Sequence, residues 1–303
     1  MGRPAKQLGA QTPYAGYVRQ KPTVSKIEEH IYRSTSSGLP NFSTYLREFW
    51  SRRVFAVEMS KSGMRSSNAN NVLGSFWLVL NPLLLAFVYY LLINVLTGNN
   101  SAQSDPQRLP HIVGGIFAYY FFAGCMSGGT NSVVAAGRLI MNTPFPRLLL
   151  IYSVVRTAFF RFLPTIPVFF IIYLVKGQHF NVYQLLAIPT FFLLLLAGFG
   201  IAALLATAQV YFRDTSSFLP YVNRVWLYVS PILFYWEKIY DSVGAWAYLN
   251  PLYPIMGIWG DVLIRGTLPP VELWYAATLW SVLIFTVGSI LFISKESDFA
   301  VRI

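Results

Sequence analysis

The sequence predicts an all-α polytopic membrane protein, and three observations carry that prediction. Of the 303 residues, 55% are hydrophobic and only 12% are charged, whereas an ordinary soluble domain has roughly 25% charged residues. Apolar runs of about 20 residues recur, each long enough to cross the roughly 30 Å hydrocarbon core of a bilayer as a helix. Lysine and arginine are divided unequally between the segments that join these runs, as multi-pass membrane proteins require.

The first segment, residues 1–40, is polar and rich in proline, glycine and serine. It contains no apolar core of the kind that a secretory signal needs. A segment of this composition cannot bury enough apolar surface to fold alone. We therefore expect a disordered cytoplasmic extension.

Residues 41–71 are predicted to form an amphipathic interface helix and a linker. Apolar side chains recur at helical spacing, and charged side chains take the other face. The apolar set is Phe42, Tyr45, Leu46, Phe49, Trp50, Val54 and Val57, and the charged set is Arg47, Glu48, Arg52, Arg53, Glu58 and Lys61. A basic, aromatic helix of this kind lies in the inner membrane interface, where it anchors the chain and can offer its polar face to a cytoplasmic partner.

Residues 72–303 are predicted to form a domain of six transmembrane helices. The spans are expected at Leu73–Leu96, Ile112–Ala135, Leu148–Val175, Tyr183–Val210, Phe218–Tyr235 and Leu273–Ile293. Between the fifth and sixth spans, residues 236–266 are aromatic and interrupted by proline and glycine. We expect short re-entrant or outer helices there, since irregular backbone at membrane depth is tolerated only where protein buries it.

The distribution of basic residues predicts the topology. With both termini in the cytoplasm, 19 of the 23 lysines and arginines fall on the inner side, and only Arg108, Lys176, Lys238 and Arg265 on the outer side. This asymmetry follows the positive-inside rule. The net charge of +11 is therefore explained by basic residues at the inner face of the membrane. We expect this chain to contact membrane lipids, and we expect no nucleic-acid partner.

Sequence motifs for catalysis and cofactor binding are missing. There is no GxxxxGK[ST], HExxH, GxSxG or CxxC, and His30, His111 and His179 are scattered. The carboxylates of the outer segments are spread along the chain: Asp105, Glu237, Asp241, Asp261 and Glu272. We expect no catalytic residues, no metal site and no cofactor in this chain, so a separate polypeptide would have to supply the energy for any driven transport.

Four stretches resemble the type-2 ABC exporter permeases. LGSFWLVLNPLLLAFVYYLLI (Leu73–Ile93) is similar to their first span, and residues 111–147 to their second span and the loop that follows. VYFRDTSSFLPYVNRVWLYVSPILF (Val210–Phe234) resembles their fifth span, and NPLYPIMGIWGDVLIRG (Asn250–Gly266) the outer segment before the last helix. The resemblance runs from about residue 41 to the end and is strongest to the polysaccharide-export branch, which handles O-antigen, teichoic acid or mycobacterial galactan.

This resemblance implies a homodimer in the bacterial cytoplasmic membrane with two cytoplasmic ABC ATPase subunits. ATP and magnesium would bind to those partners and not to this chain. In such permeases the interface helix and the loop after the second span contact the ATPase. The matching residues here are Arg47, Arg52, Arg53, Gly137, Arg138, Pro144 and Arg147.

Three arginines lie deeper than loop residues should. Arg161 is about 20 Å along a helix from Leu148 at 1.5 Å per residue, with Arg156 and Arg224 less deep. An arginine exposed to lipid at such depth is costly, so each should face a cavity, a partner or a route to the lipid phosphates. The functional interpretation is binding of the anionic head group of a polyprenyl-linked glycan, since guanidinium donates paired hydrogen bonds to phosphate. Snorkelling to inner-leaflet phosphates is the alternative.

Aromatic side chains are the second candidate feature. The predicted lining of a glycan channel is Phe76, Trp77, Tyr119, Tyr120, Phe122, Trp226 and Tyr228. Aromatic faces can hold sugar rings, although interfacial belts and ordinary packing use the same residues. Glycine pairs such as Gly124 with Gly128 and Gly198 with Gly200 indicate close helix packing.

The function favoured by sequence and resemblance is that of a permease subunit in an ATP-driven exporter of a polyprenyl-diphosphate-linked polysaccharide, with cell-wall galactan as one candidate. A type-2 ABC permease for a drug or a simple lipid is one alternative. The other alternative is an ATP-independent flippase or a membrane glycosyltransferase. This sequence shows neither the clustered nor the midspan carboxylates that such proteins use.

Overall fold

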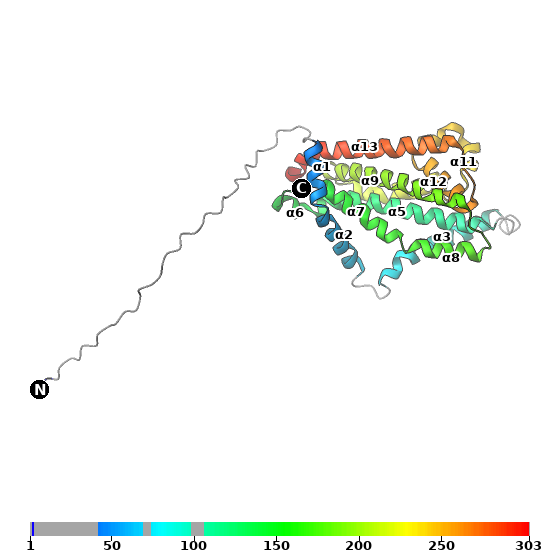
Figure 1. The fold of residues 1–303 in the computed structure, drawn as a ribbon, viewed down its shortest axis with the longest axis horizontal. Helices are drawn as coiled ribbons and strands as arrows, with labels where there is room; N and C mark the ends of the chain where they lie inside the picture. The colour runs from blue at the N-terminus through cyan, green and yellow to red at the C-terminus, as the bar shows by residue number, and fades with distance from the viewer. Residues whose placement is uncertain (1, 3–41, 69–73, 98–105, 303) are drawn as a thin grey trace. The chain divides into compact units, whose positions relative to one another are not determined.

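The computed structural model describes residues 2, 42–68, 74–97 and 106–302, and every regular element in those ranges is helical (Figure 1). Apart from Gly2, the predicted extension of residues 1–40 lies outside these ranges, as do Leu73 and the end of the predicted linker. The main helices are α3 (Trp77–Thr97), α5 (Arg108–Ala135), α7 (Leu148–Phe162), α8 (Thr165–Val175), α9 (Ala187–Tyr211), α10 (Thr215–Val229) and α13 (Val271–Arg302).

Helix α5 forms the centre of the bundle. It packs against α3, α7, α9 and α10, and α9 in turn lies between α5 and α13. Most residues in the apolar part of α5 are buried, whereas most of those in the apolar part of α13 are not. A helix that is apolar on all sides belongs in the interior, and an exposed apolar helix of this length belongs against lipid.

Four helical stretches are long and apolar enough to cross a membrane, taking the described residues alone: Arg108–Ala135, Leu148–Val175, Val182–Tyr211 and Val271–Arg302. The apolar stretch Trp77–Ile93 is shorter. The fifth predicted span is shorter than expected, because α10 ends at Val229 after 15 residues, about 22 Å. The reason is Pro231, since the residue before a proline avoids the helical conformation and Ser230 is extended. The count of six spans therefore stays a prediction.

The third predicted span is not one straight helix. α7 ends at Phe162 and α8 begins at Thr165. Pro164 lies between them, and a proline inside a helix removes one backbone hydrogen bond and clashes with the preceding turn. The hydroxyl of Thr165 donates to the carbonyl of Phe162 across the break at 2.7 Å.

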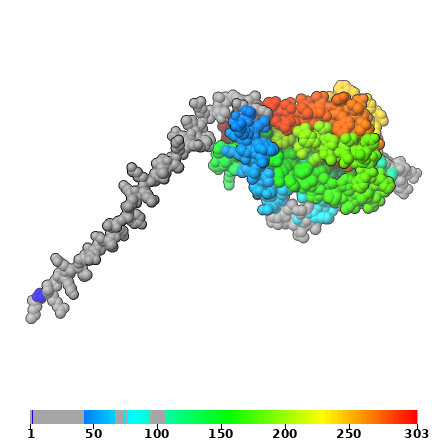
Figure 2. Space-filling model, in the orientation of Figure 1, coloured from blue at the N-terminus to red at the C-terminus, as the bar shows by residue number. Residues whose placement is uncertain are grey.

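The predicted interface helix is two helices, α1 (Phe42–Ser51) and α2 (Arg53–Asn68), with a turn at Arg52. α2 packs against α7. Both helices lie at the end of the bundle that carries α6 (Gly137–Asn142) and the C-terminus (Figures 1 and 2). We call this the C-terminal end and the opposite one the far end.

At the far end, the segment between α10 and α13 forms short helices, as the sequence predicted. They are α11 (Trp236–Val243), η3 (Gly244–Leu249), α12 (Leu252–Gly260) and the π-helical turn η4 (Asp261–Arg265), and η2 (Val182–Leu186) lies beside η4. Every residue of α12 is buried. The segment is thus part of the packed bundle and not a loose loop.

Two glycines allow α9 and α13 to touch through their backbones. A Cβ atom at Gly200 would lie 2.2 Å from the carbonyl oxygen of Ile284, and one at Gly288 would lie 2.2 Å from that of Gly200. Gly128 is also tight, with 2.6 Å to Val154, whereas a Cβ at Gly124 would make an ordinary 3.5 Å contact. Close packing therefore depends on Gly200, Gly288 and Gly128 more than on Gly124.

Candidate functional site

A cavity of about 680 Å³ lies between α2, α3, α5 and α7. Three of the predicted site residues line it: Trp77, Tyr120 and Arg161. Its other walls are mixed. The remaining polar members are Ser60, Asn81, Ser127, Ser153, Thr157 and Thr165, and the large apolar ones include Pro82, Phe117, Phe121 and Phe162. We call it the arginine cavity.

The arginine cavity combines one cation with hydroxyl and amide groups and an apolar wall. Arg161 reaches it from the last turn of α7, next to the break at Pro164. Arg161 is exposed as a residue, so the arginine cavity has a cationic side chain at the protein surface. Such a set suits an amphipathic ligand with a charged head, because pockets of this kind use few polar groups to orient a largely apolar molecule.

Arg156 plays a different part at the edge of this cavity. Its guanidinium donates to Ser60 Oγ at 3.0 Å and lies 4.4 Å from the centroid of the Phe160 ring. Thr157 donates to the same Ser60 Oγ at 2.9 Å. Ser60 is buried, so these bonds fasten α2 to α7.

Arg224 does not belong to the arginine cavity. It lies on the exposed face of α10, which packs against α5 and α9. A single chain therefore does not bring the three predicted head-group arginines together. Arg161 is the one that lines a cavity of suitable size.

The remaining predicted channel aromatics fall into two groups. Tyr119 and Phe122 are buried, the first donating to the carbonyl of Asn223 and the second packing against Trp226 at 5.5 Å between centroids. Both join α5 to α10, so this placement favours packing. Phe76 and Tyr228 are exposed, and the Tyr228 hydroxyl lies 3.1 Å from that of Tyr89.

At the C-terminal end, four residues from three parts of the chain meet, and we call them the Glu296 junction. Tyr45 in α1 donates to Glu296 Oε2 at 2.6 Å, and the backbone N–H of Arg147 donates to Glu296 Oε1 at 2.7 Å. The N–H of Leu148 approaches the Tyr45 hydroxyl at 3.4 Å. Burial and the neighbouring Glu296 raise the pKa of Tyr45, and burial lowers the pKa of Arg147. One carboxylate thus ties the interface helix and the start of α7 to the end of α13.

Nearby contacts strengthen the same connection. Arg52 donates to the carbonyl of Pro144, and the rings of Phe55 and Phe145 lie 5.3 Å apart. The structure therefore brings together two regions predicted to contact an ATPase, the interface helix and the loop after α6.

The other predicted ATPase-contact residues belong to α1, α2 and α6. Arg47, Arg53 and Arg138 are exposed, and Arg53 lies 4.6 Å from the centroid of the Trp50 ring. Gly137 is buried at the start of α6. The sequence pattern did not single out Glu296. The motif KESD follows an apolar helix and resembles an ordinary solvated charge cluster.

Comparison with known proteins identifies the family. The profile described as ABC-2 type transporter matches residues 58–258, about two thirds of the chain. The chain belongs to the ABC-2 type transporter family. The matched range includes most of α2 and all of α3, α5 and α7, whose residues line the arginine cavity, whereas Glu296 lies beyond it.

Two relatives of this ABC-2 chain carry a more specific description. The O-antigen export system permease protein RfbA of Klebsiella pneumoniae is 26% identical over 213 residues, which cover 70% of this chain and 81% of that protein. The protein of the same name from Myxococcus xanthus is 24% identical over 258 residues, covering 84% of this chain and 97% of its own length.

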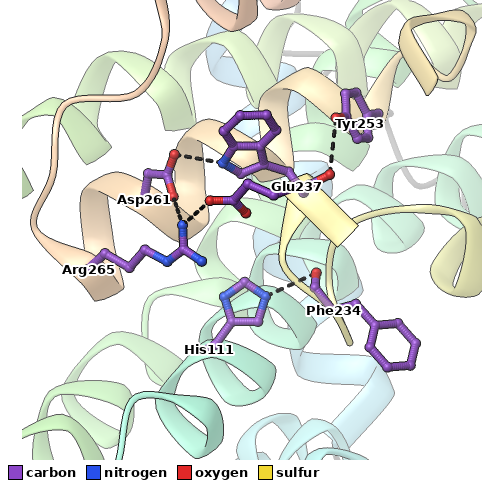
Figure 3. Close-up of polar contacts among 7 residues, drawn as sticks. His111, Phe234, Glu237, Tyr253, Asp261 and Arg265 are labelled. Carbon is purple, nitrogen blue, oxygen red and sulfur yellow. Dashed lines mark hydrogen bonds and ion pairs between the residues drawn. The ribbon is translucent and has the colours of Figure 1, made fainter. Parts of the chain in front are cut away.

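The far end of the ABC-2 chain holds a partly buried ionic cluster, shown in Figure 3. Arg265 pairs with Glu237 and, at 3.1 Å, with Asp261 Oδ1. Trp236 Nε1 donates to Asp261 Oδ2 at 2.8 Å, and Tyr253 donates to the Trp236 carbonyl at 3.1 Å. The expectation that the outer carboxylates are spread apart is wrong for Glu237 and Asp261, which the fold brings to one cation. We call these five residues the Arg265 cluster.

The Arg265 cluster joins α11 to η4 within the far-end segment. Burial raises the pKa of the Asp261 carboxyl, and the bonds from Trp236 and Arg265 oppose this rise. The ring of Tyr235 lies 4.1 Å from the Arg265 guanidinium and 4.4 Å from the ring of His111 in α5. Since α11 and η4 both contribute to the cluster, removing its one cation should loosen the whole segment.

Replacement of Arg265 by alanine is therefore expected to destabilise the protein. Asp261 is 4% exposed, and a buried charged group that loses a hydrogen-bond partner costs about 1.5–3 kcal/mol. Thermal unfolding in detergent should shift to lower temperature, and limited proteolysis should cut within residues 236–266. The matched control is Lys176→Ala, an exposed far-end cation, for which no shift is expected. Equal unfolding temperatures for the two variants would show that the cluster does not hold the segment.

Proposed function

We propose that this chain is the membrane subunit of an ATP-driven exporter that moves a polyprenyl-diphosphate-linked polysaccharide across the bacterial cytoplasmic membrane. The observation that carries the proposal is the arginine cavity, which is lined by Arg161, by hydroxyl groups and by apolar side chains. The family and the two RfbA relatives support export of a glycan. Cell-wall galactan is one substrate that fits this class.

In this proposal the arginine cavity receives the head group of the substrate. A diphosphate carries negative charge, and guanidinium recognises phosphate oxygens through paired hydrogen bonds. The aromatic faces of Trp77 and Tyr120 are available beside it for the first sugar or the first isoprene unit. The lipid part would follow the apolar wall formed by Pro82, Phe117 and Phe162.

The working unit would be a homodimer of six-span subunits with both termini in the cytoplasm. The C-terminal end is then the cytoplasmic end, where Arg47, Arg53 and Arg138 are exposed for two ATPase subunits. Exposed apolar side chains on α10, among them Phe218, Tyr221 and Val225, offer a surface for the second copy. Movement of the ATPases would reach α7 and α13 through the Glu296 junction.

Arg161→Gln is the decisive variant for the head-group role. A hydrogen bond to a charged group contributes about 1.5–3 kcal/mol, so the apparent affinity for the lipid-linked glycan should fall about tenfold or more. The measurement is ATP hydrolysis by proteoliposomes that hold this chain and its ATPase, titrated with polyprenyl-diphosphate-linked glycan. Arg213→Gln, which removes an exposed arginine outside the cavity, should leave the titration unchanged.

The same assay distinguishes the remaining possibilities. A wild-type glycan titration of ATP hydrolysis for both Arg161→Gln and Arg224→Gln would reject the head-group role of the deep arginines. Stimulation by a drug or simple lipid, with none by the glycan, would assign the chain to another substrate class. Failure to co-purify with any ABC ATPase would reject the exporter proposal itself.

A further inference from the structure

A second cavity, of about 550 Å³, lies in the half of the bundle toward the far end. Its walls come from α5, the α7–α8 break, η2, α9, α12 and η4. Aromatic rings dominate the lining: Phe117, Phe159, Phe162, Phe169, Phe170, Phe180, Phe191 and Trp259. We call it the aromatic cavity. It shares Phe117, Phe162 and Thr165 with the arginine cavity but lacks Arg161.

The polar side chains of the aromatic cavity are already bonded to the protein. Gln184 donates to the Tyr173 hydroxyl at 2.8 Å and to the Leu263 carbonyl at 2.9 Å. Asn181 donates to the Gly266 carbonyl at 3.0 Å.

Two further donors are satisfied in the same way. Trp259 Nε1 donates to the Gly114 carbonyl at 3.1 Å, and the Thr165 hydroxyl donates to the Phe162 carbonyl. An occupant of the aromatic cavity therefore meets ring faces and methyl groups, and none of these donors points at it. Cavities lined in this way stay dry and take up apolar molecules.

The exposed members of the lining show where the cavity opens. Leu163, Phe180, Leu185 and Ile188 are all exposed, Ile188 to 70%. Leu163, Leu185 and Ile188 belong to stretches long and apolar enough to cross a membrane, and Phe180 lies between two of them. In a bilayer the opening would therefore face the hydrocarbon or its border. The molecule with access to it is the one that bathes this surface, a bilayer lipid.

We propose that the aromatic cavity is a binding site for one acyl chain of a bilayer phospholipid. The head group remains outside, because no cation lines the cavity. The site is separate from the proposed head-group site of the transported substrate, since the arginine cavity holds Arg161 on the other side of Phe117 and Phe162. This inference does not depend on which glycan is exported.

Photolabelling of the full-length protein tests the site. The protein is reconstituted in phosphatidylglycerol liposomes with a phospholipid that carries a diazirine in its acyl chain, illuminated and mapped by mass spectrometry. Lipid at the outer surface reaches exposed residues only. Trp259 and Phe169 line the aromatic cavity but not the arginine cavity, and they are 7% and 3% exposed, so label on either residue requires a chain inside the aromatic cavity. We expect label on both.

Two variants and a second probe define the outcomes. Ala187→Phe places a ring in the cavity and should abolish the label on Trp259, whereas Ala276→Phe on α13, also half-buried but outside the cavity, should keep it. The second probe is a diazirine-bearing polyprenyl phosphate. Label confined to exposed residues, or label on Trp259 from the polyprenyl probe alone, would overturn the phospholipid site. Both readouts use protein without ATPase, so they are independent of the exporter assay.

Discussion

Gly200→Ala is expected to prevent most of the protein from reaching a stable fold. The added methyl carbon would lie 2.2 Å from the Ile284 carbonyl oxygen, well inside van der Waals contact. The obstacle is backbone in the middle of α13, so it cannot rotate away as a flexible side chain can. Overpacking in a core costs about 1–3 kcal/mol and occasionally more, and this site lies at the upper end or beyond.

The measurement is the yield of monodisperse protein in detergent together with its thermal unfolding temperature. Gly124→Ala makes the same chemical change in α5, where the nearest atom would lie 3.5 Å away, and it should leave both quantities unchanged. Gly288→Ala should reproduce the Gly200 result, because its methyl group would meet the Gly200 carbonyl from the other side. Wild-type yield and unfolding temperature for Gly200→Ala would show that α9 and α13 do not pack this closely.

Glu296→Ala is expected to lower stability and to uncouple the interface helix from the bundle. It removes the acceptor of both the Tyr45 hydroxyl and the Arg147 N–H. A buried donor left without an acceptor costs about 1–3 kcal/mol. Glu296→Gln should lose less, because its amide oxygen can still accept one of the two bonds.

Two measurements separate the structural effect from the coupling effect of Glu296. Thermal unfolding reports the first, and substrate-stimulated ATP hydrolysis in proteoliposomes reports the second. We expect Glu296→Gln to retain most of the stability but to lose most of the stimulation, since the junction is weakened at its centre. The control is Glu58→Ala, whose exposed pairing with Lys61 contributes little. Full stimulation with Glu296→Ala would show that the junction plays no part in coupling.

The helices were largely predictable, because their signals are local. Long apolar runs predict helices wherever water is excluded. The predicted spans Ile112–Ala135 and Leu273–Ile293 are helical, and the observed helices Arg108–Ala135 and Val271–Arg302 extend beyond them. The two predicted spans that differ from the structure do so at prolines. Pro164 divides the third predicted span, and Pro231 ends α10 early. Both residues were visible in the sequence, but whether a proline kinks a helix or ends it depends on what packs around it.

The surroundings of the site residues could not be predicted in the same way. Helical rise places Arg156 and Arg161 at different depths on one helix, but only the fold shows that the first bonds to Ser60 while the second lines a cavity. The Arg265 cluster joins residues of α11 and η4 that are far apart in sequence. Glu296 resembles any charge at a helix end until Tyr45 and Arg147 are placed beside it.

The break at Pro164 divides the third span into two segments, α7 and α8. Phe162 and Thr165 flank that break, and both line the arginine cavity as well as the aromatic cavity. A change in the angle between α7 and α8 therefore reshapes the two spaces together. A hydrocarbon chain that binds one conformation of α7 and α8 more tightly than another shifts the population toward that conformation. If both proposed sites are occupied, the composition of the surrounding bilayer would act on the arginine cavity through the shared residues Phe162 and Thr165.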